Sequence, residues 1–259
     1  MIKAVFFDVD GTLLSQKQGK VPISTRRALR RIRKKGIKIF IATGRHMIEL
    51  SKLPVMEIPF DGYLTLNGNL ILDENKKAYA GTPISADEVE VLSGIFRAKK
   101  IPFVMISSDK RYINYVDDVV VETQASTHGT IPDIGTVNDY DGEKIYQCIA
   151  FVQDHERKVL DEILDECSIT SWNPTGIDIV ARGSGKAAGI AQFIEEQGLD
   201  RSEIMAFGDG ENDIGMLKYA GIGVAMGNAG DAVKAAADYV TDSVDENGIE
   251  NALKHFGLV

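Results

Sequence analysis

The sequence contains little cysteine, and the little that it has does not fit a cysteine-based fold. Its 259 residues include two cysteines, Cys148 and Cys167, with no CxxC spacing. This pattern does not match a disulfide framework or a cysteine-containing zinc site. We therefore expect both thiols to stay reduced, and we predict that neither is a nucleophile.

Long apolar runs and an excess of positive charge are also lacking. No run is long enough to span a bilayer, and the N-terminus has no signal-peptide pattern, so we expect a soluble, cytoplasmic protein with no membrane partner. The net charge of -9 argues against general affinity for nucleic acid or an anionic membrane. The negative net charge is compatible with a phosphorylated substrate, because a bound cation can make the electrostatic potential positive at one site. Nothing predicts an oligomeric state.

The most informative feature that is present is a pair of carboxylates, Asp8 and Asp10, after the apolar run of residues 5–7. Such a run is typical of a strand covered on both faces in a parallel sheet. Ligands bind outside the carboxyl ends of such strands, and Gly11 permits a sharp turn there. One carboxylate could attack or bind metal while its neighbour transfers a proton. Taken alone, a pair of this kind is more often a solvated turn.

Three later segments also place functional groups at predicted strand or helix ends. Thr43 follows the apolar residues 37–42, and Lys186 begins a predicted helix after a glycine-containing loop. Asp209 and Asp213 follow the predicted strand 204–207. A lysine at a helix N-terminus suits an anion, and acid clusters with only oxygen ligands favour Mg²⁺ over zinc. Each segment alone has an ordinary structural explanation, but together and in this order they indicate a site.

The order of predicted elements indicates an α/β fold interrupted by a second module. Strand and helix alternate over residues 1–82 and again over 184–259, as in a Rossmann-like parallel-sheet core domain. Residues 83–183 repeat a helix-strand-strand pattern, which predicts an inserted α+β domain. Its predicted elements are a helix at 86–99, strands at 103–106, 112–115 and 144–152, a helix at 155–167, and strands at 169–172 and 177–181.

The ordered motifs resemble those of the haloacid dehalogenase superfamily, and within it the Cof-like phosphatases. The resemblance covers essentially the whole chain. Its motifs are the DVDGT run at 8–12, ATGR at 42–45, Lys186, and the GDGEND run at 208–213. The long insertion after Thr43 is similar to a cap of the second type, in the variant found in Cof-like enzymes. Many relatives have glycine after the motif lysine, whereas Ala187 stands here.

The resemblance implies roles for the acidic residues. Asp8 would attack phosphorus and form an aspartyl-phosphate, and Asp10 would protonate the leaving alcohol and then activate water. Mg²⁺ would be held by the Asp8 carboxylate, the Asp10 backbone carbonyl and Asp209. Asp213 would orient Lys186 or metal-bound water.

The remaining motif residues would bind phosphate or substrate. Thr43, the Gly44 amide and Lys186 would stabilise the transferring phosphoryl group. Asn212 could bind phosphate or merely stabilise its turn, and Arg45 could contact substrate or form a surface ion pair. The inserted domain would supply specificity through the loops at 107–111, 128–130 and 172–176.

The leading hypothesis is therefore a Mg²⁺-dependent phosphatase acting on a small phosphorylated metabolite such as a sugar phosphate. A phosphomutase could use the same aspartate pair, although such relatives often carry their cap between the first two motifs. A dehalogenase has no need of the second acid or the metal ligands. A non-catalytic sugar-phosphate sensor is the alternative from a different class, and the intact motif residues argue against it.

Overall fold

The apolar residues of β1 (Ala4–Phe7) form a central strand whose side chains are all buried. This strand pairs in parallel with β12 (Ile204–Gly208) on one side and β2 (Lys38–Ala42) on the other. Both of its faces are covered by helices, which explains why the strand is apolar throughout rather than alternating.

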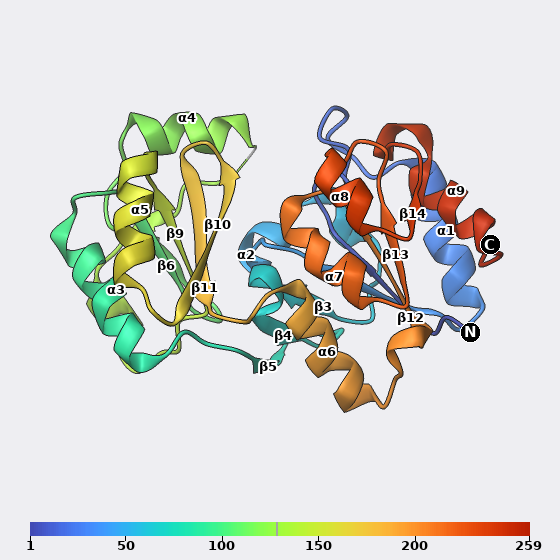
Figure 1. Cartoon of the computed structure of the whole chain (residues 1–259), viewed down its shortest axis with the longest axis horizontal. Coiled ribbons are helices and arrows are strands. Elements are labelled where there is room, and N and C mark those ends of the chain that lie inside the picture. Colours follow the sequence, from blue (N-terminus) through green and yellow to red (C-terminus); the bar gives the residue numbers. More distant parts are fainter. Residues whose placement is uncertain (128) are drawn as a thin grey trace. The chain divides into compact units, whose positions relative to one another are not determined.

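The computed structural model describes residues 1–127 and 129–259, and they divide into two units, each with its own sheet (Figure 1). The core unit comprises residues 1–80 and 185–259, and the insert unit comprises residues 81–184. In the described part of the chain, no helix has both the length and the apolar character needed to cross a membrane.

The sheet of the core unit has eight strands in the order β14-β13-β12-β1-β2-β3-β4-β5. The strands from β14 to β3 are parallel, and β4 returns antiparallel to β3. The other strands are β3 (Tyr63–Thr65), β4 (Leu70–Leu72), β5 (Ala78–Gly81), β13 (Ile222–Ala225) and β14 (Tyr239–Val240). The α-helices are α1 (Ile23–Lys34), α2 (Met47–Leu50), α6 (Lys186–Gln197), α7 (Ile214–Tyr219), α8 (Asp231–Ala236) and α9 (Gly248–His255).

Helices pack on both faces of this sheet (Figure 1). On one face, α6, α7 and α8 pack over a cluster in which Phe6 stacks on Phe40 and meets the edge of Phe193. Alternation along β1 sends Phe7 to the opposite face, where it stacks on Phe207 and where α1 and α9 lie against each other. Because helices cover both faces of the sheet, the ends of its parallel strands are held in place, and the polar loops begin at these ends.

The insert unit has a six-stranded mixed sheet in the order β10-β11-β9-β6-β7-β8. Its helices α3 and α5 bury Leu92, Phe96 and Leu160 against the sheet, and both cysteines lie in the same apolar cluster as free, buried thiols. The strands are β6 (Phe103–Ile106), β7 (Arg111–Ile113), β8 (Asp133–Ile134), β9 (Gln147–Phe151), β10 (Cys167–Asn173) and β11 (Gly176–Ala181). The helices are α3 (Ala86–Ala98), α4 (Asp118–Ser126) and α5 (Asp154–Ile163).

The predicted fold class, a Rossmann-like parallel-sheet core with an inserted α+β domain, is confirmed. The predicted extents were wrong at some element ends. The strand expected at 144–152 begins only at Gln147, and the helix expected at 155–167 ends at Ile163. Cys167 instead begins β10 and pairs with Ala181 of β11. Strand pairing within the sheet outweighs the local helical pattern at this point.

Candidate active site

Four polar side chains of the core unit lie in loops that follow neighbouring parallel strands. Asp8 follows β1, Thr43 follows β2, Asp209 follows β12 and Asn228 follows β13. The carboxyl ends of parallel strands share one edge of the sheet, so residues far apart in sequence gather there. The Asp8 backbone N–H donates to the carbonyl of Phe207 at 2.9 Å, which continues the sheet ladder and fixes where the Asp8 side chain leaves the backbone.

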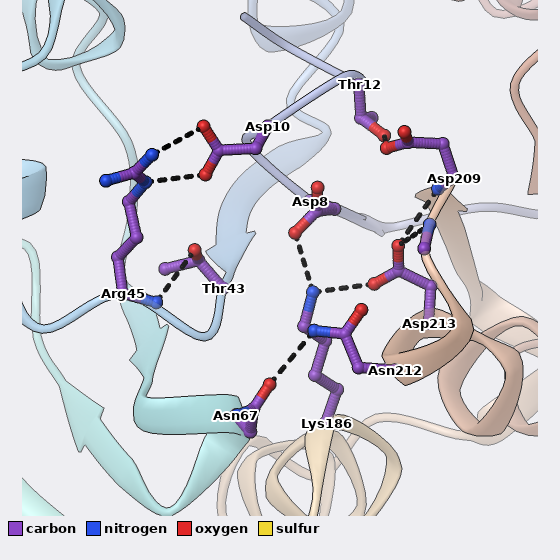
Figure 2. A network of polar contacts seen from close by, with 11 residues as sticks. Asp8, Asp10, Thr12, Thr43, Arg45, Asn67, Lys186, Asp209, Asn212 and Asp213 are labelled. Carbon is purple, nitrogen blue, oxygen red and sulfur yellow. Dashed lines mark hydrogen bonds and ion pairs between the residues drawn. The ribbon is translucent and has the colours of Figure 1, made fainter. Parts of the chain in front are cut away.

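Lys186 is the centre of the most buried part of this edge. Its Nζ donates to Asp8 Oδ1 and to Asp213 Oδ1, each at 2.6 Å (Figure 2). The other oxygen of Asp213 accepts the backbone N–H groups of Asp209 at 2.9 Å and Gly210 at 2.8 Å. Asp213 therefore positions Lys186 and at the same time holds the loop that carries Asp209.

Burial and neighbouring charges together shift the pKa values of Lys186 and Asp8. Burial alone would lower the pKa of Lys186, but the carboxylates of Asp213 and Asp8 raise it above its ordinary value, so the side chain stays an ammonium ion. Burial raises the pKa of Asp8 well above its ordinary value, and nearby carboxylates add to this against the effect of Lys186. The buried edge therefore carries more carboxyl groups than one ammonium can balance.

The position of Lys186 is set by a close approach between two backbones. The turn after β3 contains Gly68, whose φ is +83°, and a Cβ atom there would lie 2.8 Å from the carbonyl oxygen of Gly185. A left-handed φ and this short distance both favour glycine. The turn thus packs directly against the first residue of α6 and places Lys186 at the helix N-terminus.

Asp209 is held from two sides by neutral donors. Thr12 Oγ1 donates to Asp209 Oδ1 at 2.8 Å, and Asn228 Nδ2 donates to Asp209 Oδ2 at 3.1 Å. Gly11 makes this approach possible, because a Cβ atom at Gly11, with φ +84°, would lie 2.2 Å from Asp209 Oδ2. Burial raises the pKa of Asp209 to about 7, although the hydrogen bond from Thr12 acts to lower it.

The carboxylate oxygens gathered at this sheet edge are suited to bind a hard divalent cation. One carboxylate oxygen from each of Asp8, Asp209 and Asp213 lies within 4.8 Å of the others. Asp213 binds the Lys186 ammonium ion through one oxygen and two backbone amides through the other, whereas each oxygen of Asp209 accepts one neutral donor and keeps lone-pair capacity for a cation. Asp8 and Asp209 are therefore the carboxylates best suited to bind a cation. An oxygen-only set of this kind is typical of Mg²⁺.

Asp10 and Arg45 form a separate pair at the outer side of the site. Arg45 Nε donates to Asp10 Oδ2 at 2.6 Å and Arg45 Nη2 donates to Asp10 Oδ1 at 2.9 Å (Figure 2). The Arg45 backbone N–H also donates to Thr43 Oγ1 at 3.2 Å. Sequence reasoning considered Arg45 as a substrate ligand or a surface ion-pair partner, and the structure pairs it with the second aspartate of the first motif.

The remaining predicted residues surround the Asn67 side chain. Asn212 Nδ2 donates to Asn67 Oδ1 at 3.0 Å, and the Asn67 backbone N–H donates to the Thr43 carbonyl at 2.9 Å. Gly44 lies against the same amide, since a Cβ atom there would be 3.1 Å from Asn67 Oδ1. Asn67 therefore links the loop after β2 to the loop after β12.

The structure brings Asp8, Lys186, Asp209 and Asp213 together and places Asp10 with Arg45 beside them. Sequence reasoning did not single out Asn228. Its one signal is that Asn228 follows an apolar strand, β13, as Asp8 and Asp209 follow theirs.

The predicted specificity loops belong to the insert unit. Residues 107–111 lead from β6 into β7, and residues 172–176 join β10 to β11. Trp172 is 38% exposed and meets Phe151 edge-on. In the third predicted loop, at 128–130, His128 lies outside the described residues.

Comparison with known proteins gives a consistent result along the whole chain. The family profile of haloacid dehalogenase-like hydrolases matches residues 5–253. YkrA, a proposed phosphatase of Bacillus subtilis, is 34% identical over 258 residues, which cover 99% of this chain and 98% of the relative. The 5-amino-6-(5-phospho-D-ribitylamino)uracil phosphatase YcsE of Bacillus subtilis is 32% identical over 259 residues, covering 99% and 96%. The solved structure of the subclass IIB sugar phosphatase BT4131 superposes with a TM-score of 0.89 at 35% identity, covering 99% of this chain and 100% of that one.

Proposed function

The chain belongs to the haloacid dehalogenase-like hydrolases and is a phosphatase of the Cof-like group, and from this premise we propose a Mg²⁺-dependent phosphomonoesterase with a covalent intermediate. The observation that carries the proposal is the Lys186 ammonium ion held between Asp8 and Asp213, with Asp209 beside them. A buried cation next to a strand-end carboxylate suits transfer of a dianionic group.

Asp8 is the proposed nucleophile. A carboxylate oxygen of Asp8 attacks phosphorus, the bond from phosphorus to the ester oxygen breaks, and the alcohol leaves. Water then attacks the phosphorus of the aspartyl-phosphate, which releases inorganic phosphate and restores the Asp8 carboxylate. The fixed backbone of Asp8 and its place at the sheet edge support this role.

Asp10 is the proposed proton-transfer group for both steps. It gives a proton to the departing alcohol oxygen, and it takes a proton from the attacking water in the second step. Both oxygens of Asp10 accept hydrogen bonds from Arg45, so at least one of these bonds must open before Asp10 can carry the proton that it gives to the leaving group. The Thr43 hydroxyl, the Gly44 amide and Lys186 would stabilise the phosphoryl oxygens during transfer.

The proposed cofactor is Mg²⁺. The carboxylates of Asp8 and Asp209 and the backbone carbonyl of Asp10 would hold it, and Asp213 supports this set through Lys186 and the loop amides. When bound, the cation would offset the repulsion between the Asp8 carboxylate and the phosphate dianion.

The proposed substrate class is a phosphomonoester of a small, hydroxyl-rich metabolite. This follows from the relatives, because YcsE acts on a phosphorylated ribityl compound and BT4131 is a sugar phosphatase. We propose that the core unit carries the chemistry and that the insert unit, predicted at residues 83–183, acts as the cap that selects the substrate. Its loops at 107–111 and 172–176 are the proposed specificity segments.

The test is phosphate release from a panel of sugar, polyol and nucleoside monophosphates, with Mg²⁺ and with EDTA. We expect release that requires Mg²⁺ and is lost in Asp8→Asn, because an amide cannot replace the attacking carboxylate. Asp231→Asn, at an exposed position that begins α8, is the matched control and should behave like the wild type. Equal release with EDTA, or full activity in a folded Asp8→Asn variant, would contradict the proposal.

A further inference from the structure

The side chain of Asn228 connects three segments at the edge of the proposed site. Its Nδ2 donates to the backbone carbonyl of Gly11 at 3.0 Å and to Asp209 Oδ2 at 3.1 Å. Its Oδ1 accepts the backbone N–H of Val244 at 3.0 Å. One amide thus contacts the loop after β1, the loop after β12 and the turn that precedes α9.

The hydrogen bond from Val244 determines which way the Asn228 amide points. Because Oδ1 is held by an N–H donor, Nδ2 must face Gly11 and Asp209. Thr12 approaches the same carboxylate from the other side and donates to Oδ1 of Asp209 at 2.8 Å. Both oxygens of Asp209 therefore have an assigned donor, and the plane of the carboxylate is fixed.

The turn that orients Asn228 also holds the segment after Asp10. Asp245 Oδ1 accepts hydrogen bonds from Ser15 Oγ at 2.7 Å and from Gln18 Nε2 at 2.6 Å. The segment from Gly11 to Gln18 is therefore attached to the turn at residues 244–246 directly through Asp245 and indirectly through Asn228. These contacts join residues more than 200 positions apart in the sequence. The Asn228 amide, which also donates to Asp209, connects this segment to the loop after β12.

We propose that Asn228 is a positioning residue for the metal site, which fixes the Asp209 carboxylate relative to the backbone of residues 10–11. The inference rests on the proposed function, since it needs Mg²⁺ to bind at Asp8 and Asp209. Partners that orient a ligating carboxylate change metal affinity without touching the metal themselves. Without Nδ2, the Asp209 carboxylate can rotate away from Asp8, which lies close to it in an acidic cluster.

A purely structural role for Asn228, as a brace for the turn, would give a different result. The chain offers a matched control in Asn251, whose Nδ2 donates to Asp242 Oδ2 at 2.7 Å and to the Glu246 carbonyl at 3.3 Å. Asn251 supports the same turn but donates to neither Asp209 nor Gly11. Loss of bracing alone should therefore affect Asn251→Ala and Asn228→Ala alike.

The experiment is calorimetric titration of MgCl₂ into the full chain as wild type, Asn228→Ala, Asn228→Ser and Asn251→Ala. We expect a Kd for Mg²⁺ that is about 10- to 100-fold higher in both Asn228 variants and unchanged within about twofold in Asn251→Ala. Hydrogen exchange of the backbone amides at residues 11–13, measured without metal, should quicken in the Asn228 variants alone.

Three outcomes would overturn the inference. An unchanged Kd in folded Asn228→Ala, or an equal weakening in Asn251→Ala, would reject the positioning role while leaving the proposed function intact. Absence of Mg²⁺ binding by the wild type would instead contradict the proposed function, and the inference would fail with it.

Discussion

Two ion pairs in the proposed site differ in how deeply they are buried. The more buried pair contains the proposed nucleophile, and the more exposed pair contains the proposed proton-transfer group. The inner pair joins Lys186, whose side chain is fully buried, to Asp8, which is 10% exposed. The outer pair joins Arg45, which is 17% exposed, to Asp10, which is 29% exposed. Water can compete for both groups of the outer pair, whereas the Lys186 side chain of the inner pair has no exposed surface.

This contrast corresponds to the proposed division of labour. The nucleophile needs a fixed position and a constant counter-charge, and burial at the sheet edge beside the Lys186 ammonium ion provides both. The proton-transfer group has to change partners during each turnover, and a partly exposed pair can open at a modest cost. Substitutions in the inner pair should therefore have larger effects than substitutions in the outer pair.

The largest effect is expected for Lys186→Met, which removes the buried cation. Phosphatase activity should fall by at least about 10³-fold, since a buried charge that stabilises the transferring phosphoryl group is lost. The free energy of unfolding should fall by about 3–5 kcal/mol, because Asp8 and Asp213 lose their shared partner. Denaturant unfolding and phosphate release measure the two quantities.

Lys218→Met is the matched control for this substitution. Lys218 is exposed on α7 in the same unit, so its loss should change unfolding by less than about 0.5 kcal/mol. If Lys186→Met were as stable as Lys218→Met, the buried pair would not have the role that we assign to it.

A smaller effect is expected for Asp209→Asn. The amide nitrogen of the new side chain would face one of the two donors, Thr12 or Asn228, and one negative charge would be lost from the cluster. We predict a loss of activity of about 10²-fold that excess Mg²⁺ restores in part, since a weakened metal site responds to concentration. Activity measured as a function of Mg²⁺ concentration tests this, and an unchanged Mg²⁺ dependence would exclude Asp209 as a ligand.

Arg45→Gln should have an effect that depends on the leaving group. Without the bidentate guanidinium, Asp10 loses its fixed orientation, and proton transfer to the alcohol should slow kcat about tenfold for alkyl phosphates. p-Nitrophenyl phosphate has a leaving group that needs little protonation, so its kcat should change less than about threefold. Arg45→Lys should be intermediate, because it keeps the charge but not the two parallel hydrogen bonds. Equal losses on both substrates would contradict a role through Asp10.

Asn212→Ala is expected to have the smallest effect. Its amide donates to the Asn67 side chain, and Asn212 itself is exposed. We predict a change in unfolding free energy of less than about 1 kcal/mol and a loss of kcat below about threefold. A loss of tenfold or more would show that Asn212 contacts the phosphoryl group directly.

The sequence allowed prediction of those parts of the fold that depend on local pattern. The apolar runs before Asp8 and Asp209 identified two parallel strands, and the topology of a parallel sheet then placed their ends at one edge. The helix that begins at Lys186 was predicted with its observed start, since a glycine-containing loop precedes it.

The features that were not predicted depend on contacts between separate segments of the chain, which no local sequence pattern indicates. The partner of Arg45 is a residue 35 positions away and is chosen by the path of the loop after β2. Asn228 acquires its contacts with Gly11 and Asp209 only when β1, β12 and β13 are side by side. The end of α5 was missed because Cys167 pairs with a strand that follows it in sequence.

The central claim is that Asp8 carries the phosphoryl group during turnover. The most direct measurement is to quench the wild-type protein in acid while it hydrolyses a phosphate ester with Mg²⁺, and to locate the added phosphoryl group by peptide mass spectrometry. We predict that the group is on Asp8 and is absent from the same peptide of Asp8→Asn. Steady turnover with no phosphorylated Asp8, or the same label in Asp8→Asn, would contradict the account.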